Sequence, residues 1–171
     1  MQEALLSWGA GRRRDLPWRR TRDPWSILVS EVLLQQTQAG RVVPHHQAFL
    51  NRFPTPAACA AAPVAEVVRA WAGLGYNRRA VNLHRTATAV VERHGGALPT
   101  ELDALLALPG VGPYTARAVL AFAFERDVGL VESNTGRVVA RLAGRPLRAV
   151  ETQGLADTSC PRARAGRGTR P

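Results

Sequence analysis

The chain has 171 residues, 46% of them hydrophobic, and a formal net charge of +10. This length suits one domain or two small intertwined ones, and the basic balance favours a polyanionic partner such as DNA or RNA. The N-terminus lacks a long apolar run and the two cysteines form no disulfide or zinc pattern, so we expect a reduced, cytosolic protein without a membrane span.

A helical pattern runs through most of the chain. We expect helices over residues 3–8, 25–38, 41–53, 56–62, 63–73, 77–94, a helix pair at about 102–124, and 135–143. No convincing strand alternation interrupts them, so the predicted fold class is all-α. The pattern decays from about residue 151, and we expect residues 151–171 to form a disordered tail.

The helix that begins at Pro24 carries an acidic residue inside an apolar run. Asp23 is a suitable N-cap, and Pro24 suits the first helical position. Glu31 lies within ILVSEVLL, where a buried carboxylate is costly unless it is neutral or paired. Burial raises a carboxyl pKa, and a carboxyl that stays protonated near neutral pH can act as a general acid. The alternative is a partly exposed Glu31, or one bonded to a neighbouring backbone group.

Two polar segments could contact a nucleic acid. Gln35 and Gln36 follow on the same predicted helix, and their amides could bond base edges or fill the gap left by an extruded base. Tyr76 lies beside Arg78 and Arg79 in a glycine loop, where an aromatic ring could stack on a base and arginines could bind phosphates. The alternatives are a polar helix end and an ordinary surface tyrosine.

The sequence LPGVGPYTA at 108–116 joins two apolar helices through a tight turn. Such a turn needs glycine for positive φ, and glycines let a phosphate approach the N–H groups of a helix N-terminus. We interpret the segment as a helix–hairpin–helix that binds a nucleic-acid backbone without reading sequence. Its expected contacts are Gly110, Val111, Gly112 and Thr115. The alternative is an ordinary glycine turn between packed helices.

A second candidate carboxylate lies in LVESNTGRVVAR. Glu132 ends an apolar stretch, and Ser133 or Asn134 could cap the next helix, which alone would explain either residue. A carboxylate near Glu31 would give a pair in different environments, one acid and one anion. Such a pair suits cleavage of a glycosidic bond through a cationic transition state.

Read together, these segments resemble the helix–hairpin–helix DNA glycosylase superfamily, and most closely its adenine glycosylases. The resemblance covers about residues 5–158. Its anchors are LPWR (16–19), DPW and LVSEVLLQQTQ (23–38), RFPT (52–55), WAGLGYNRRAVNLH (71–84), HGG (94–96), LPGVGPYTARAV (108–119) and VESNTGRVVAR (131–141). It implies a six-helix domain over 23–131 and a second helical domain from 1–22 and 132–150. It also implies a monomer acting on double-stranded DNA with adenine opposite 8-oxoguanine or guanine.

The resemblance further implies roles for individual residues. Glu31 would protonate the adenine leaving group and handle the water, and Glu132 would stabilise the cationic sugar. Asn134 and Tyr114 would line the same pocket. The residues expected to shape the adenine pocket are Trp18, Arg19, Leu34 and Gln35, and those expected to wedge into the duplex are Gln36 and Tyr76.

Tyr114 occupies the place where strand-cutting relatives have a Schiff-base lysine. The chain contains no lysine, so hydrolytic base removal is favoured over lyase chemistry. The same observation argues against an endonuclease III-like enzyme of other base specificity. A second alternative is a DNA-binding module that keeps the hairpin and lacks catalysis.

The chain departs from this family at three places. Glu132 replaces an aspartate, which moves the carboxylate by about a bond length, and a displacement of ~1 Å can cost about a hundredfold in rate. Gly136 replaces a charged or polar residue. The chain ends before the family's four-cysteine [4Fe-4S] motif and its 8-oxoguanine-sensing domain. Because Cys59 and Cys160 cannot ligate such a cluster, we expect no cofactor or metal.

The last residues are compatible with a frameshift near Thr158 or Ser159. Written as GGG CGT GGA ACC AGG CCC and a TGA stop, GRGTRP contains AWNQAL in another frame, which resembles the family helix at this place. We hypothesise that the tail beyond this point is a frameshift product. Gene sequencing tests this, and the hypothesis fails if no single-base change restores AWNQAL and downstream cysteines.

Overall fold

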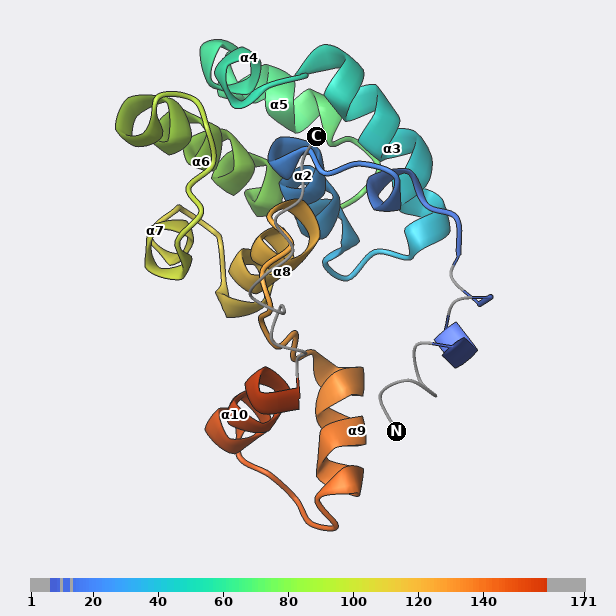
Figure 1. Cartoon of the computed structure of the whole chain (residues 1–171). Helices are drawn as coiled ribbons and strands as arrows, with labels where there is room; N and C mark the ends of the chain where they lie inside the picture. The colour runs from blue at the N-terminus through green and yellow to red at the C-terminus, as the bar shows by residue number, and fades with distance from the viewer. Residues whose placement is uncertain (1–6, 10, 13, 160–171) are drawn as a thin grey trace, which may run out of the picture.

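In this computed structural model, residues 7–9, 11–12 and 14–159 are described, and their regular elements are all helical (Figure 1). The predicted all-α class is therefore confirmed. The elements are η1 (Pro17–Arg19), α2 (Pro24–Leu34), α3 (Ala39–Arg52), α4 (Pro56–Ala61), α5 (Val64–Ala70), α6 (Arg78–His94), α7 (Leu102–Leu106), α8 (Pro113–Ala123), α9 (Ser133–Leu142) and α10 (Ala149–Ser159). The helix expected over 3–8 lies mostly outside the described residues. Within the described part, no helix is long and apolar enough to cross a membrane.

Helix α2 is the central element of the fold. Both carboxylate oxygens of Asp23 cap it, accepting hydrogen bonds from the N–H groups of Trp25 at 3.2 Å and Ser26 at 3.0 Å. Nearly all of α2 is buried, because α3, α6, α8 and η1 pack around it. This burial explains its near-continuous apolar sequence. It also places Glu31 inside the molecule.

The other helices extend this core on two sides (Figure 1). Helices α4 and α5 pack against α6, while α7 packs against α8. The largest fully buried side chains include Trp25, Trp71 and Phe49, and the Trp25 Nε1–H donates to the Phe53 carbonyl at 2.9 Å. The core thus fixes α2 and α8, the two helices that carry the candidate acid and the hairpin.

The hairpin joins α7 to α8 through a turn that contains two glycines. Only one of them has a backbone conformation that favours glycine. Gly110 has φ +77°, whereas Gly112 is extended with φ −90°. A Cβ on Gly110 would lie 2.7 Å from the Cβ of Asn82 on α6. Thr86 of the same helix donates to the Pro109 carbonyl at 2.5 Å. The turn is therefore held against α6 as well as between its own helices.

Helix α2 ends at Leu34, four residues earlier than predicted. Gln35 has ψ 114° and Gln36 has φ +55°, so neither residue continues the helix. The physical reason is the Arg79 guanidinium, which donates hydrogen bonds to the Val32 and Leu33 carbonyls at the end of α2. The two glutamines are consequently carried on a loop and not on a helix face.

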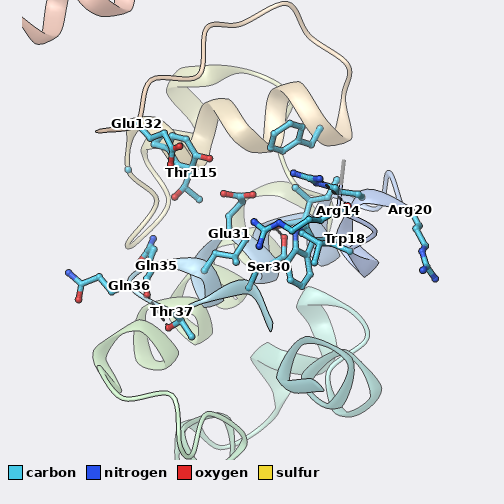
Figure 2. Close-up of a pocket in the computed structure, with 18 of the residues that line it drawn as sticks. Arg14, Trp18, Arg20, Ser30, Glu31, Gln35, Gln36, Thr37, Thr115 and Glu132 are labelled. Carbon is cyan, nitrogen blue, oxygen red and sulfur yellow. Dashed lines mark hydrogen bonds between the residues drawn. The ribbon is translucent and has the colours of Figure 1, made fainter. Parts of the chain in front are cut away.

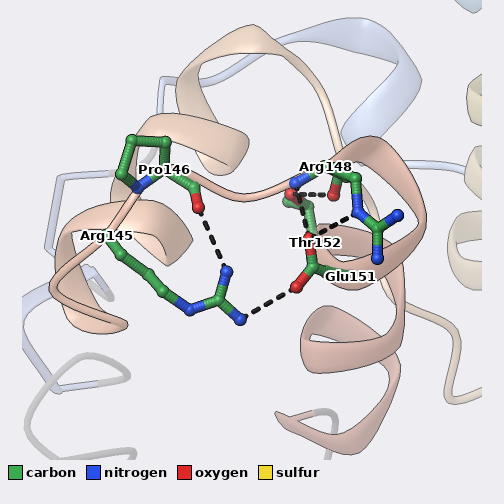
Figure 3. A network of polar contacts seen from close by, with 5 residues as sticks. All are labelled: Arg145, Pro146, Arg148, Glu151 and Thr152. Atoms are coloured by element: carbon green, nitrogen blue, oxygen red, sulfur yellow. Dashed lines mark hydrogen bonds and ion pairs between the residues drawn. The ribbon is translucent and has the colours of Figure 1, made fainter.

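The prediction of a disordered tail from residue 151 was wrong for residues 151–159, which belong to α10. Figure 3 shows the network at its start, where Glu151 accepts from the backbone N–H of Arg148 and from the Arg145 guanidinium. These bonds hold the pKa of Glu151 low, at about 2. The polar cap lies at the helix N-terminus, where an anion is favoured. Residues 160–171, with the remaining tail and most of the suspected frameshift, lie outside the described part.

Helices α9 and α10 pack on one another and lie to one side of the main core (Figure 1). The 1–22 segment was expected to join 132–150 in a second domain. Leu16 and Trp18 instead belong to the main core, and η1 packs on α2. The reason is that η1 packs on α2, and this packing buries the two apolar side chains.

Helix α10 is tied to α8 through Asp157. Its Oδ1 atom accepts from the Gly129 N–H at 2.8 Å and from Arg117 Nη1 at 2.7 Å. Gln153 donates to the Gly129 carbonyl at 2.9 Å. These contacts fix the segment that leads to Glu132.

Replacing Asp157 with alanine should lower the free energy of unfolding by about 1–3 kcal/mol, because it leaves a part-buried N–H and a guanidinium without their acceptor. Urea unfolding followed by far-UV circular dichroism measures the change. Glu92→Ala on the exposed face of α6 is the matched control. Equal midpoints for the two variants would contradict the assigned role of Asp157.

Candidate active site

A pocket of about 1380 Å³ lies between α2, η1, the N-terminal end of α8 and the segment preceding α9 (Figure 2). It is larger than the ~300–1,000 Å³ usual for small-ligand sites and is open to solvent. Its walls combine an acidic centre with apolar and arginine side chains. An extruded nucleotide or a similar flat, anionic group would fit a site of this kind.

Glu31 forms the centre of the pocket. Helix α2 presents its carboxyl into the cavity, on the side where Glu132 and Thr115 lie (Figure 2). Glu31 is only 7% exposed, and burial raises its pKa to about 7, with a smaller contribution from the Glu132 charge. The predicted burial is therefore observed. A carboxyl with this pKa is protonated in a large share of molecules near neutral pH and can give up its proton.

Tyr114 lies at the start of α8 and lines the same pocket. Burial raises the pKa of its phenol to about 12, and the charges of Glu31 and Glu132 act in the same direction. The phenol therefore keeps its proton at neutral pH. It can donate a hydrogen bond to a carboxylate or to an oxygen of a bound molecule.

Glu132 occupies a different environment from Glu31. It is exposed at the pocket margin, at the N-cap position of α9. The site thus holds one buried acid and one exposed carboxylate, which are the two kinds of group that glycosidic bond cleavage needs.

Most of the residues expected to shape the pocket lie in its walls. Trp18 is buried with its ring edge-on to His46, at a centroid distance of 5.4 Å. Arg19 is exposed and donates to the Arg14 carbonyl at 3.0 Å. The other predicted residues that line the pocket are Leu34, Gln35, Gln36, Tyr114, Thr115, Gly110 and Gly112.

The predicted residues outside this lining are Asn134, Tyr76, Val111, Arg78 and Arg79. Asn134 is exposed on α9, and its amide oxygen accepts from Arg137 Nη2 at 2.8 Å. Tyr76 is 67% exposed on the loop before α6. The Asn134 amide is thus turned toward its own helix, while the Tyr76 ring is exposed outside the pocket.

The structure gives different roles to three of the residues expected to bind the DNA backbone. The Val111 N–H closes the turn on the Leu108 carbonyl, and its side chain is buried. Thr115 is buried in the pocket wall. Arg79 donates to backbone carbonyls, so its guanidinium is occupied inside the protein. A Cβ placed on Gly112 would meet no atom within 4 Å, and Arg78 is exposed. Both residues are therefore open to contact with a phosphate.

Sequence reasoning missed several pocket residues. Arg14, Arg20 and Arg22 line the cavity, although Arg19 was the only arginine selected from residues 9–22. Phe122 also lines it and is 41% exposed. Its position seven residues after Thr115 places both on one face of α8, and this spacing was the available signal.

No group of three or more metal-ligating side chains occurs among residues 7–9, 11–12 and 14–159. Cys59 lies fully buried in the core, where burial raises its thiol pKa to about 12. A thiol of this kind is a poor cluster ligand, because the thiolate is the ligating form. The described residues therefore do not fit a [4Fe-4S] cluster.

Residues 29–156 match the family model described as "HhH-GPD superfamily base excision DNA repair protein". The chain belongs to this family. The chain is 51% identical over 138 residues to the adenine DNA glycosylase of Mycolicibacterium smegmatis, covering 80% of this chain and 47% of that protein. The human adenine DNA glycosylase is 41% identical, with 81% of this chain and 27% of the human protein covered. The chain thus spans about half or less of the length of these relatives.

Other relatives carry a different name. A thymine/uracil-DNA glycosylase of Pyrobaculum aerophilum is 38% identical over 145 residues, covering 84% of this chain and 63% of that protein. A solved thermostable thymine-DNA glycosylase superposes with a TM-score of 0.84 at 33% identity, covering 91% and 75% of the two chains. An endonuclease III–DNA covalent intermediate superposes with a TM-score of 0.81 at 23% identity, which shows the shared fold.

Proposed function

We propose that this chain is an adenine DNA glycosylase that hydrolyses the N-glycosidic bond of adenine opposite 8-oxoguanine or guanine. The observation that carries the proposal is the buried Glu31 carboxyl, whose pKa is raised to about 7 at the centre of the pocket. The names of the relatives at about 40–50% identity support adenine as the base. We further propose a monomer that acts on chromosomal DNA in the cytoplasm and needs no cofactor for this step.

The proposed reaction uses the two carboxylates in sequence. Protonated Glu31 donates its proton to the adenine ring as the C1′–N bond breaks, so the bonding electron pair leaves with the base. The sugar then carries positive charge, which the Glu132 carboxylate stabilises. Ionised Glu31 accepts a proton from water as the water oxygen bonds to C1′. The products are free adenine and an abasic site.

The surface around the pocket suits duplex DNA. Gly112 is the N-cap of α8, and the space beside its α-carbon is open. At a helix N-terminus, the N–H groups and the helix dipole favour a phosphate. Gln36 and Tyr76 are exposed and can enter the space that the extruded adenine leaves. Tyr114 stands where a lyase would have its amine, so the proposed chemistry is hydrolytic.

A panel of duplexes tests the proposal. The target base is adenine, thymine or uracil, each opposite 8-oxoguanine or guanine, and alkali reveals abasic sites as strand breaks. We expect breaks only at adenine. Breaks at thymine or uracil would instead favour the activity named for the Pyrobaculum relative. Duplex binding without breaks at any base would favour a non-catalytic DNA-binding module.

The raised pKa of Glu31 sets the expected pH dependence. Because the acid must be protonated in the free enzyme, kcat/KM should fall about tenfold per pH unit well above pH 7. The stability contribution of protonated Glu31 is complete below the unfolded pKa of about 4.5 and is lost as pH rises to the folded value of about 7. Steady-state assays and urea unfolding from pH 5 to 9 measure both trends. A rate that stays constant from pH 6 to 9 would contradict the assigned acid.

A further inference from the structure

Arg79 occupies an unusual position between two loops of the DNA-facing surface. Its guanidinium donates to five backbone carbonyl oxygens at 2.6–3.2 Å, those of Val32, Leu33, Gln35, Leu74 and Gly75. The first three belong to the end of α2 and its following loop, and the other two belong to the loop before α6. One side chain therefore joins two segments about 40 residues apart in the sequence.

Two aromatic rings also lie close to the guanidinium. Its central carbon lies 5.4 Å from the ring centroid of Trp71 and 5.7 Å from that of Tyr76. Trp71 is fully buried, whereas Tyr76 is 67% exposed. Arg79 thus connects a fixed core ring to an exposed ring through cation–π contacts.

Both loops hold a residue in the left-handed region. Gln36 has φ +55° and Tyr76 has φ +50°, and neither is glycine. A conformation of this kind costs about 1–2 kcal/mol for an L-residue and persists only where the surroundings determine it. Two of the carbonyls that accept hydrogen bonds from Arg79 belong to Gln35 and Gly75, the residues immediately before these two.

We infer that Arg79 is a positioning residue that fixes Gln36 and Tyr76 in one joint geometry for insertion into the duplex. This inference rests on the proposed function, because it assigns the two side chains to the gap left by an extruded base. A planar fork with five N–H donors can bond several carbonyls in different directions at once, whereas an ammonium is a compact point charge. Arg79 acts on DNA through the two loops and not by contact with a phosphate.

A double-mutant cycle with Tyr76 separates this role from a general loss of stability. The ligand is a duplex with a tetrahydrofuran abasic analogue opposite 8-oxoguanine, which cannot be cleaved, so the result does not depend on catalysis. Arg79→Met removes the guanidinium and keeps an apolar stem. We expect it to weaken binding about tenfold or more in the wild-type chain and less than threefold in the Tyr76→Ala background.

The experiment includes a control substitution on α6 and a second substitution at Arg79. Arg85→Lys, on an exposed part of α6, should leave both affinities unchanged. Arg79→Lys keeps the charge and is used if Arg79→Met does not fold, with an expected loss of about threefold to tenfold that also disappears in Tyr76→Ala. An equal loss in both backgrounds, or no loss in either, would overturn the inference. Failure of the glycosylase assay with the cycle intact would overturn only the proposed reaction.

Discussion

Replacing Glu31 with glutamine is expected to lower the single-turnover rate of adenine release by about 10³-fold, within the 10²–10⁴ usual for a general acid–base. Glutamine keeps the size of the protonated side chain but has no acidic proton. The buried position also predicts that the variant folds, because the neutral amide avoids the cost of a buried charge. Alkali-revealed strand breaks at pH 7 measure the rate.

The same experiment includes a structural control. Above pH 7 the Glu31→Gln variant should unfold at an equal or higher urea midpoint than the wild type, because only the wild type carries the ionised buried group. Glu92→Gln on exposed α6 should retain the wild-type rate. A Glu31→Gln variant with a tenth or more of the wild-type rate would remove Glu31 from the role of acid.

Replacing Gly110 with alanine is expected to lower the free energy of unfolding by about 3 kcal/mol, from positive φ and overpacking together. The new Cβ would lie 2.7 Å from the Cβ of Asn82, which the α6 backbone fixes, so the turn must shift. Because the turn presents the N-terminus of α8, we also expect duplex affinity to fall by more than tenfold under conditions where the variant stays folded.

Gly40→Ala provides the matched comparison for this hairpin variant. Gly40 lies in α3 with ordinary φ, and no atom lies within 4 Å of a Cβ placed there. The substitution should leave stability unchanged or raise it, since alanine is the better helix former. Urea unfolding and fluorescence anisotropy with a labelled duplex measure the two quantities. Equal stability of the Gly110→Ala variant and the wild type would contradict the assigned geometry.

The central helix and the hairpin were predictable because their signals are local. The Asp23–Pro24 pair marks the start of α2, and the apolar run places Glu31 inside the molecule. The glycines between 109 and 112 mark the turn, although only Gly110 has positive φ. Local signals of this kind depend on caps, periodicity and backbone freedom, which a sequence displays directly.

The features that were missed depend on distant contacts. An arginine beside a tyrosine looks the same whether it binds a phosphate or, like Arg79, five carbonyls from two loops. The weak pattern of α10 did not reveal that Asp157 would bond Gly129 and Arg117. The early end of α2 at Leu34 follows from the same guanidinium. Only the tertiary arrangement supplies such partners.

The most direct test of the account is to identify the products released from a duplex containing adenine opposite 8-oxoguanine. The wild-type chain is incubated in excess over DNA at pH 7, and free bases are identified by mass spectrometry, with borohydride added to a parallel sample. We predict release of free adenine, an intact abasic strand, and no protein–DNA adduct, because no lysine is present to form a Schiff base. Binding of the duplex without release of adenine would contradict the proposed function, and a trapped adduct would contradict the hydrolytic mechanism.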